Sequence, residues 1–341
     1  MKKRRQMHTM LKEAVSKDKW KDFGAVFLII LFLPYLCVTF FGNNRFFKNN
    51  IAVGSPWKIE EMSLDKNSFY IKKEVAAGSE LIPMEEYLIG LTAGNIPMDV
   101  LDETVKAQII ILRTAIVKKG IKKEDYNYVE AMNLSLVYLT NEEMKNLFGV
   151  EYAATLDRIK GLIQSTKGII ITYHGSPIEA PFFAISAGTT RDAREVLGSI
   201  EYPYLISVNS EKDMFAENYL KIENIKISEF NKLIKIAYPN LKENDEEDNH
   251  LVCVEDSAGY ILSVQFGDKK LSGEEFRKIF HLNSSSFELI IEENGITITT
   301  KGLGHGLGFS QYGGNQLAKD GKGFIEIVKY YYSNVEVEKI E

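Results

Sequence analysis

The sequence predicts an α+β fold of mixed hairpins and helices in an exported domain, preceded by one transmembrane helix. An uncharged apolar run covers 23–42, an amphipathic helical pattern covers 97–119, and short alternating segments follow one another between 251 and 300. Strands joined by turns, with helices between them, favour α+β over a parallel α/β sheet. The 341 residues are 45% apolar and 26% charged, which is typical of globular proteins and excludes a disordered chain.

The apolar run Phe23–Gly42 has the length of a membrane span, about 30 Å at 1.5 Å rise per residue. A cleaved signal peptide is the alternative, but its apolar core is shorter and ends in a small-x-small site, which Thr39–Phe41 do not provide. Eight Lys/Arg against three Asp/Glu precede the run and predict a cytoplasmic N-terminus. We therefore expect a single-pass protein of the cell membrane, with a cytoplasmic basic tail (1–22), a transmembrane helix (23–42), a stalk with leading strands (43–79) and an extracytoplasmic domain (80–341).

Periodic apolar residues and capping signals predict the helices of this domain. In the first, Pro97 suits the first turn, acidic residues follow it, and Lys118, Lys119 and Gly120 close the helix. The expected helices are Pro97–Lys119, Tyr152–Gln164, Ser228–Ile236 and Ser272–Phe280.

Alternating apolar segments bounded by turn residues predict the strands. One or two strands are expected within Trp57–Val75, and a hairpin is expected to turn at His174–Ser176 between Gly168–Tyr173 and Pro177–Ile185. Four more strands are expected at Leu251–Val254, Tyr260–Phe266, Phe287–Ile291 and Gly295–Thr300. The acidic run 243–248 is expected to be a solvated loop, and residues 209–290 are expected to form a subregion packed on the core.

Charge and motif content exclude several classes of function. Beyond the tail, 33 Lys/Arg face 44 Asp/Glu, which argues against nucleic acid as a partner. Two cysteines exclude a disulfide scaffold or a Cys-rich zinc module. The five histidines show no metal-binding spacing, and no HExxH or CxxC motif occurs, so we expect no metal and no cofactor.

Three segments could carry chemistry. Gly302–Gly314 (GLGHGLGFSQYGG) is glycine-rich and carries His305, Ser310 and Gln311. A phosphate-binding loop would lie within a βαβ unit, which the sequence does not predict here. A purely structural loop is the alternative to a binding site. Phe183–Thr190 offers Ser186, Gly188, Thr189 and Thr190 for a polar ligand, although such residues also favour turns. Lys106 and Arg113 lie two turns apart on one helix face, which could equally be a solvated cationic edge.

These segments, in this order, resemble the stage II sporulation protein D family, also called the SpoIID/LytB domain. The resemblance covers most of 80–337, and its most specific parts are the KAQ…RT helix and the GHG…SQYG segment. The matching stretches are IPMEEYLIGLTAGNIP (82–97), LDETVKAQIIILRTA (101–115), FFAISAGTT (182–190), EYPYLISVNSEKD (201–213), LSGEEFRKIFHLNSSSFEL (271–289), GLGHGLGFSQYGGNQLAKDG (302–321) and IVKYYYSNVEV (327–337).

The resemblance implies action on peptidoglycan. Family members resemble lytic transglycosylases that cleave peptide-free glycan strands during engulfment of the forespore. The resemblance also implies stage II sporulation proteins M and P as partners. One carboxylic acid protonates the glycosidic oxygen, and a hydroxyl of the same sugar closes a 1,6-anhydro ring. The resemblance implies that Lys106 and Arg113 belong to the catalytic centre. The residues that it implies for substrate binding are Ser186, Gly188, Thr190, His305, Ser310 and Gln311.

At the position of the family's catalytic Glu this chain has Asn95, in Gly94–Pro97. An amide has no proton of useful pKa to transfer, and the loss of a general acid typically costs about 10²–10⁴-fold in rate. A substitute acid among nearby groups would restore cleavage; the candidates are Glu85, Glu86, Asp99, Glu179 and protonated His305. The sequence thus favours a glycan-binding protein with weak or no cleavage, and it leaves open an active lytic transglycosylase with a displaced acid and a protein-binding scaffold or amidase enhancer.

Overall fold

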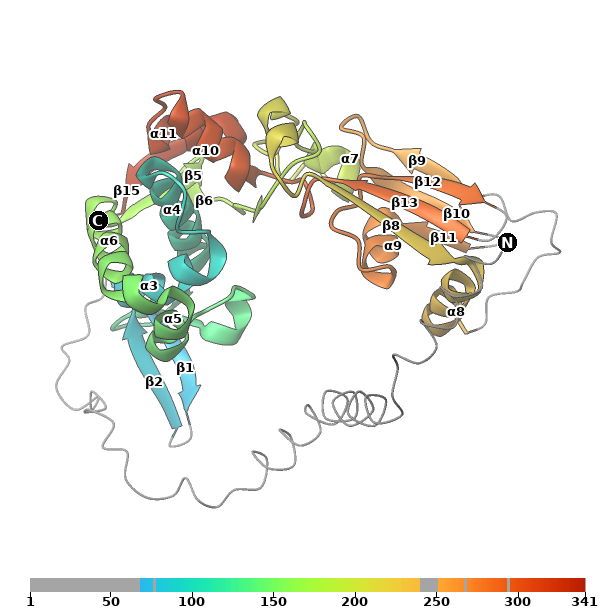
Figure 1. Ribbon diagram of the computed structural model, residues 1–341. Coiled ribbons are helices and arrows are strands. Elements are labelled where there is room, and N and C mark those ends of the chain that lie inside the picture. Colours follow the sequence, from blue (N-terminus) through green and yellow to red (C-terminus); the bar gives the residue numbers. More distant parts are fainter. Residues whose placement is uncertain (1–67, 76–77, 240–250, 267–268, 293–294, 341) are drawn as a thin grey trace, which may run out of the picture. The chain divides into compact units, whose positions relative to one another are not determined.

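The computed structural model describes residues 68–75, 78–239, 251–266, 269–292 and 295–340. Among these residues it has helices and several small sheets, which confirms the predicted mixed α+β class (Figure 1). The predicted tail, transmembrane helix, stalk and acidic loop lie outside the described residues, apart from the end of the 43–79 stretch. Within the described residues, no helix is long and apolar enough to cross a membrane.

The helices connect and cover the sheets. They are α3 (Met84–Asn95), α4 (Asp102–Lys118), α5 (Asn141–Phe148), α6 (Tyr152–Ser165), α7 (Ala193–Leu197), α8 (Ile227–Ala237), α9 (Gly273–Ile279), α10 (Gln311–Lys319) and α11 (Phe324–Tyr331), with short 3₁₀ turns at Ala131–Leu134, Gly149–Glu151 and Glu211–Phe215. Those expected near 152–164, 228–236 and 272–280 are therefore present, and Ser272 begins α9 with the reciprocal hydrogen bonds of a capping box.

The strands form small, mostly antiparallel sheets. The first is β2-β1-β4-β3, built from β1 (Phe69–Val75), β2 (Gly78–Pro83), β3 (Ile121–Lys122) and β4 (Asn127–Glu130), with β1 and β4 parallel. Two three-stranded sheets follow: β11-β10-β9, from β9 (Val252–Glu255), β10 (Ile261–Phe266) and β11 (Lys269–Ser272), and β12-β13-β8, from β8 (Leu220–Lys226), β12 (Phe287–Glu292) and β13 (Gly295–Lys301). The remaining sheets are β15-β5-β6, from β5 (Ile169–Tyr173), β6 (Ser176–Pro177) and β15 (Glu336–Lys339), and the parallel pair β14 (Phe309–Ser310) and β7 (Phe182–Phe183).

Two predicted elements differ in extent. The helix expected from Pro97 begins at Asp102, because residues 98–100 form a turn and a bend, in which Arg158 donates to the carbonyls of Met98 and Val100. The hairpin at His174 and Gly175 is present, with φ of 49° and 71° as a type I′ turn requires. Its second strand ends at Pro177 rather than Ile185, since the chain then leaves β5 and pairs with β14.

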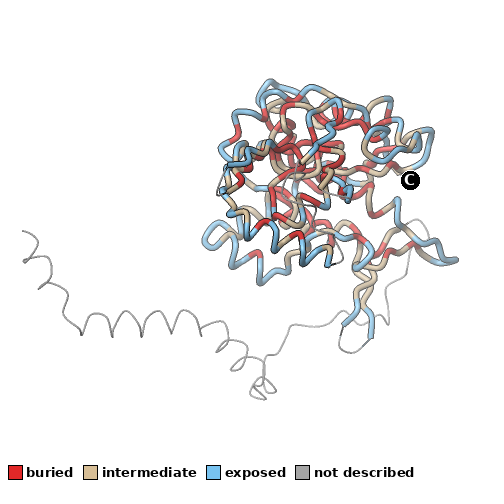
Figure 2. Tube along the Cα trace, turned by 90° about the vertical axis from the view of Figure 1, so that its right-hand side faces the viewer, coloured by how far each residue is buried: buried red, intermediate tan, exposed pale blue. Residues whose placement is uncertain are grey.

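Helix α4 lies between two hydrophobic cores. Val105, Ile109 and Leu112 pack with α3, α6, β1 and β4, while Ile110 and Ile111 pack with β5, α11 and Phe309. A helix that is apolar on nearly every side is buried in this way. Figure 2 shows such buried stretches in red inside the folded chain.

A third core lies within 225–298. It packs α8 and α9 against the sheets β11-β10-β9 and β12-β13-β8. Within it Phe230 stacks on Phe280, and the ring of Phe276 lies tilted against both. The predicted subregion 209–290 overlaps this core. Buried Arg191 links the core to the rest of the chain through an ion pair with Asp256, whose oxygen lies 2.6 Å from Nε.

Candidate functional site

Asn95 is the last residue of α3. Acidic residues in the first turn favour the start of this helix, and the helix ends before Pro97, which disfavours a helical residue in front of it. The Asn95 side chain is engaged with backbone groups: Nδ2 donates to the carbonyls of Leu91 (2.7 Å) and Val137 (2.6 Å), and Oδ1 accepts from the Val137 amide (3.3 Å). Asn95 therefore ties the end of α3 to the chain at 137.

Two amides of α10 hold the chain that follows Asn95. The Gln311 Nε2 donates to the Asn95 carbonyl and to the Gln108 Oε1 (2.9 Å). One turn later, Asn315 Oδ1 accepts from the Leu101 amide at 3.0 Å. The glycine-rich segment thus fixes the backbone on both sides of the connection between α3 and α4, and Gln311 supports the site without lining it.

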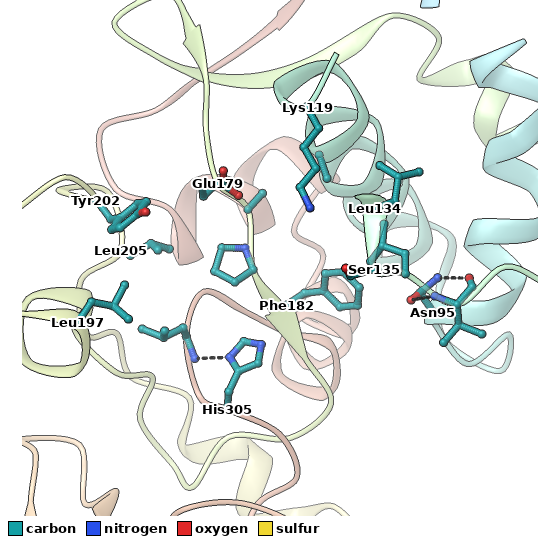
Figure 3. Close-up of a pocket in the computed structure, with 16 residues that line it drawn as sticks. Asn95, Lys119, Leu134, Ser135, Glu179, Phe182, Leu197, Tyr202, Leu205 and His305 are labelled. Atoms are coloured by element: carbon teal, nitrogen blue, oxygen red, sulfur yellow. Dashed lines mark hydrogen bonds between the residues drawn. The ribbon is translucent and has the colours of Figure 1, made fainter. Parts of the chain in front are cut away.

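A pocket of about 530 Å³ opens beside Asn95 (Figure 3). Its walls are mostly apolar, with a few polar groups, as in typical small-molecule sites. Lining residues come from the end of α4, the chain at 134–137, the chain at 179–182, the chain at 197–205 and the loop at 305–307; they are Asn95, Ala115, Lys119, Leu134, Ser135, Leu136, Val137, Glu179, Ala180, Pro181, Phe182, Leu197, Tyr202, Leu205, His305 and Leu307.

Besides the Tyr202 phenol, three of the lining side chains carry ionisable groups: Lys119, Glu179 and His305. Lys119 Nζ donates to the Asn133 carbonyl at 2.8 Å. The carboxylate of Glu179 makes no hydrogen bond or ion pair with the described residues, while its backbone amide donates to the Tyr204 hydroxyl at 3.0 Å. Glu179 is the one carboxylate among the residues that line this pocket.

His305 is half-buried, and its imidazole is hydrogen-bonded to the backbone. Its Nδ1 accepts the Leu307 amide at 3.1 Å, as Figure 3 shows. Burial lowers the pKa of His305, and the attraction of Glu274 and a hydrogen bond to the Phe182 backbone oppose that shift only in part. A neutral imidazole with Nδ1 as acceptor suits a loop-fixing residue and is poorly suited to a general acid at neutral pH.

The cationic residues expected on one helix face occupy different surroundings. Arg113 is fully buried: it donates to both carboxylate oxygens of Glu85 at 2.8 Å, and to the Ile169 carbonyl at 3.1 Å. Lys106 pairs with Glu103 at 2.6 Å. Neither lines the pocket, and the pairing with Arg113 engages Glu85, one of the candidate substitute acids.

Two other candidate acids lie away from the pocket. Glu86 is exposed in the first turn of α3, nine residues or about 14 Å along the helix from Asn95. Asp99 is exposed in the connection that precedes α4. Of the candidate acids, the structure therefore brings only Glu179 and His305 into the pocket beside Asn95.

The polar residues expected near Gly188 are gathered around a buried carboxylate that the sequence did not single out. Asp213 Oδ2 accepts from the Ser186 amide (2.6 Å) and from the Ser310 hydroxyl (2.5 Å). Burial raises the pKa of Asp213, and these hydrogen bonds oppose the shift. A lone Asp in a turn-rich segment gives no spacing signal, so only its place in the matching stretch 201–213 marks it in the sequence.

Gly188 and Thr190 shape the same neighbourhood. Gly188 has a φ of 110°, and its amide donates to the Ser186 hydroxyl at 3.1 Å. Thr190 Oγ1 accepts from the Val208 amide at 2.9 Å. Gly188 and Thr190 therefore make hydrogen bonds within the fold and do not line the pocket. Among the described residues, no group of three His, Cys, Asp or Glu side chains could hold a metal ion.

Comparison with known proteins supplies the family. A family model described as Stage II sporulation protein matches residues 73–173. Stage II sporulation protein D of Bacillus amyloliquefaciens is 33% identical over 267 residues, which cover 77% of this chain and 76% of that protein. This chain belongs to the stage II sporulation protein D family.

Other relatives agree with that assignment. Stage II sporulation protein D of Bacillus subtilis shows the same identity and coverage, and an uncharacterized protein of Brachyspira hyodysenteriae is 25% identical over 257 residues, or 74% of this chain and 66% of that protein. The resemblance read from the sequence is confirmed. The coarse function is confirmed with it: this is a sporulation protein of a family that acts on peptidoglycan.

Proposed function

We propose that this member of the stage II sporulation protein D family binds peptidoglycan glycan strands in the pocket beside Asn95 and does not cleave them from that position. Residues 23–42 anchor it in the cell membrane, with the N-terminus in the cytoplasm and the folded domain outside. It acts in engulfment or wall remodelling, together with stage II sporulation proteins M and P.

The surroundings of Asn95 support binding of a polymer. Asn95 lines the pocket of about 530 Å³ and also a second pocket of about 450 Å³, bordered by the chain at 93–98 and by Leu147 and Phe148. A linear glycan needs space on both sides of each linkage. Phe182 and Tyr202 offer ring surfaces on which the apolar faces of sugars can pack.

The observation that carries the proposal is the state of the Asn95 amide. Both Nδ2 hydrogens are used by backbone carbonyls, and the group has no proton of useful pKa to transfer. The supporting amide of Gln311 is in place, so the framework around position 95 remains while the acid is absent.

A second candidate is an active lytic transglycosylase with Glu179 as the displaced acid. Glu179 is the one carboxylate lining the pocket, and it has no hydrogen-bond or ion-pair partner among the described residues. In this reading Glu179 protonates the glycosidic oxygen as the bond to the anomeric carbon breaks. The 6-hydroxyl of the same sugar then closes the anhydro ring and returns its proton to Glu179.

Product analysis separates the two. The full-length protein in detergent, its Asn95→Glu variant and its Glu179→Gln variant are incubated with peptide-free glycan strands; binding is followed by co-sedimentation and 1,6-anhydro ends by mass spectrometry. We expect binding by all three proteins and products from Asn95→Glu alone. Products from the native chain that disappear in Glu179→Gln would establish the displaced acid, and a failure of the native chain to bind glycan would refute both readings.

A further inference from the structure

Residues 133–139, which run from the end of the 3₁₀ turn Ala131–Leu134, contribute to the wall of the pocket and are here called the strap. At its start, the Asn133 carbonyl accepts a hydrogen bond from Lys119 at the end of α4. Further on, Val137 exchanges two hydrogen bonds with the Asn95 side chain, and the Leu139 amide donates to the Gly90 carbonyl at 3.1 Å. The strap is therefore held by the end of α4 and by the middle and end of α3.

Helix α3 is shaped to receive the strap at close range. A Cβ on Gly90 would lie 2.5 Å from the Leu139 carbonyl oxygen, and one on Gly94 would lie 2.6 Å from the Val137 oxygen. Only glycine permits that approach at either position. Tyr138 stacks on Tyr87 of the same helix face, with ring centroids 4.2 Å apart. The backbone of the strap thus lies directly on α3, and the Asn95 side chain at the end of this helix holds Val137 by two hydrogen bonds.

One residue of the strap is held against its conformational preference. Ser135 has a φ of 54°, in the left-handed region that non-glycine residues rarely adopt. It lies between Leu134, which is buried in the core, and Leu136, which packs on it. Ser135 lines the pocket, and its hydroxyl makes no hydrogen bond with the described residues (Figure 3). Strained residues at ligand sites are commonly kept because they aim a functional group.

We propose that Ser135 is a glycan-binding residue and that Asn95 positions it through the strap. This inference rests on the proposed function and assigns a contact within it. The Ser135 hydroxyl can both donate and accept, so it suits a sugar hydroxyl or an N-acetyl group. The two-way bonding with Val137 requires a side chain that carries a donor and an acceptor together, which the Asn95 amide provides and an ionised carboxylate does not.

The first test separates strain from binding. In the full-length protein, Ser135→Gly removes both the left-handed penalty and the hydroxyl, whereas Ser135→Ala removes only the hydroxyl. We expect both variants to bind peptide-free glycan strands about five-fold more weakly, the loss of one hydrogen bond. The thermal midpoint of Ser135→Gly should equal or exceed that of the native chain.

The matched control is Asn334→Gly, which relieves the same strain (φ of 55°) at an exposed position outside the pocket and should leave glycan affinity unchanged. Native affinity in both Ser135→Gly and Ser135→Ala would overturn the assignment while leaving the proposed function intact. If the native chain itself binds no glycan, the proposed function fails and the inference fails with it.

The second test addresses Asn95. Asn95→Ala should accelerate amide hydrogen exchange at Val137 and Leu139 and weaken glycan binding, and adding Ser135→Ala to it should cost less than the two single losses combined. Faster exchange of the strap without any loss of affinity would refute the positioning role. Fully additive losses would also refute it, because they would show that Asn95 and Ser135 act independently.

Discussion

Replacing Asn95 by Asp is the sharpest perturbation of the site, because the two side chains have the same shape and differ in donors. The amide donates to two backbone carbonyls at 2.7 and 2.6 Å. An ionised carboxylate loses both bonds, worth about 1 kcal/mol each, and faces two carbonyl oxygens. We expect Asn95→Asp to lower the free energy of unfolding by about 3 kcal/mol at pH 7.

The same variant should be less damaging in acid. A protonated carboxyl can still donate to one carbonyl, so the loss should fall to about 1 kcal/mol below the unfolded-state pKa of about 4. The carbonyls favour the protonated form and raise the folded-state pKa, so stability falls as pH rises from about 4 through the folded value. Urea unfolding of native and variant proteins at about pH 4 and pH 7 measures the difference. Equal losses at both pH values, or none, would refute this account of the Asn95 amide.

Three further changes test the surroundings of the site. Glu85→Ala leaves the fully buried Arg113 without its bidentate partner and should cost about 3 kcal/mol in urea unfolding, whereas a loss below about 1 kcal/mol would show that the pair contributes little. The pKa of His305 is lowered in the folded state, so stability should fall as pH drops below the unfolded value of about 6.5. The difference in urea midpoint between about pH 7.5 and 5.5 should therefore shrink in His305→Gln. An unchanged difference would contradict the lowered pKa of His305. Gly94→Ala forces the strap away from α3 and should lower the thermal midpoint, while Gly161→Ala, a helical position open to solvent, should raise it slightly; a neutral Gly94→Ala would show that the strap yields without cost.

Part of the fold could be predicted because local signals are strong there. The Ser272 cap with Glu275, the His174–Gly175 turn and the amphipathic pattern of α8 each depend on neighbouring residues alone. Helix α3 was not predicted, because its glycines lower helix propensity and it is buried on several sides, which removes the periodicity of an amphipathic helix.

The sequence predicted individual residues of the site but not which of them lie together in the pocket. Asn95 and His305 were singled out, and both line the pocket. Arg113 instead forms a buried ion pair with Glu85, and the Ser310 hydroxyl donates to Asp213. A polar residue in a matching segment looks the same in sequence whether it faces a ligand or a buried partner. Ser135 could not be predicted from the sequence, because its backbone angle and its position in the pocket wall are set by contacts with α3 and α4.

The position of α4 between two cores has a consequence for how the protein folds. Residues 102–118 supply side chains to both clusters, so neither cluster can be completed before this one helix is in place. Opening either core exposes one flank of α4 and weakens the support of the other, which couples the two into one cooperative transition. Backbone amides of α4 should therefore exchange only through global unfolding, and proteolysis should yield no stable fragment of this region that lacks it.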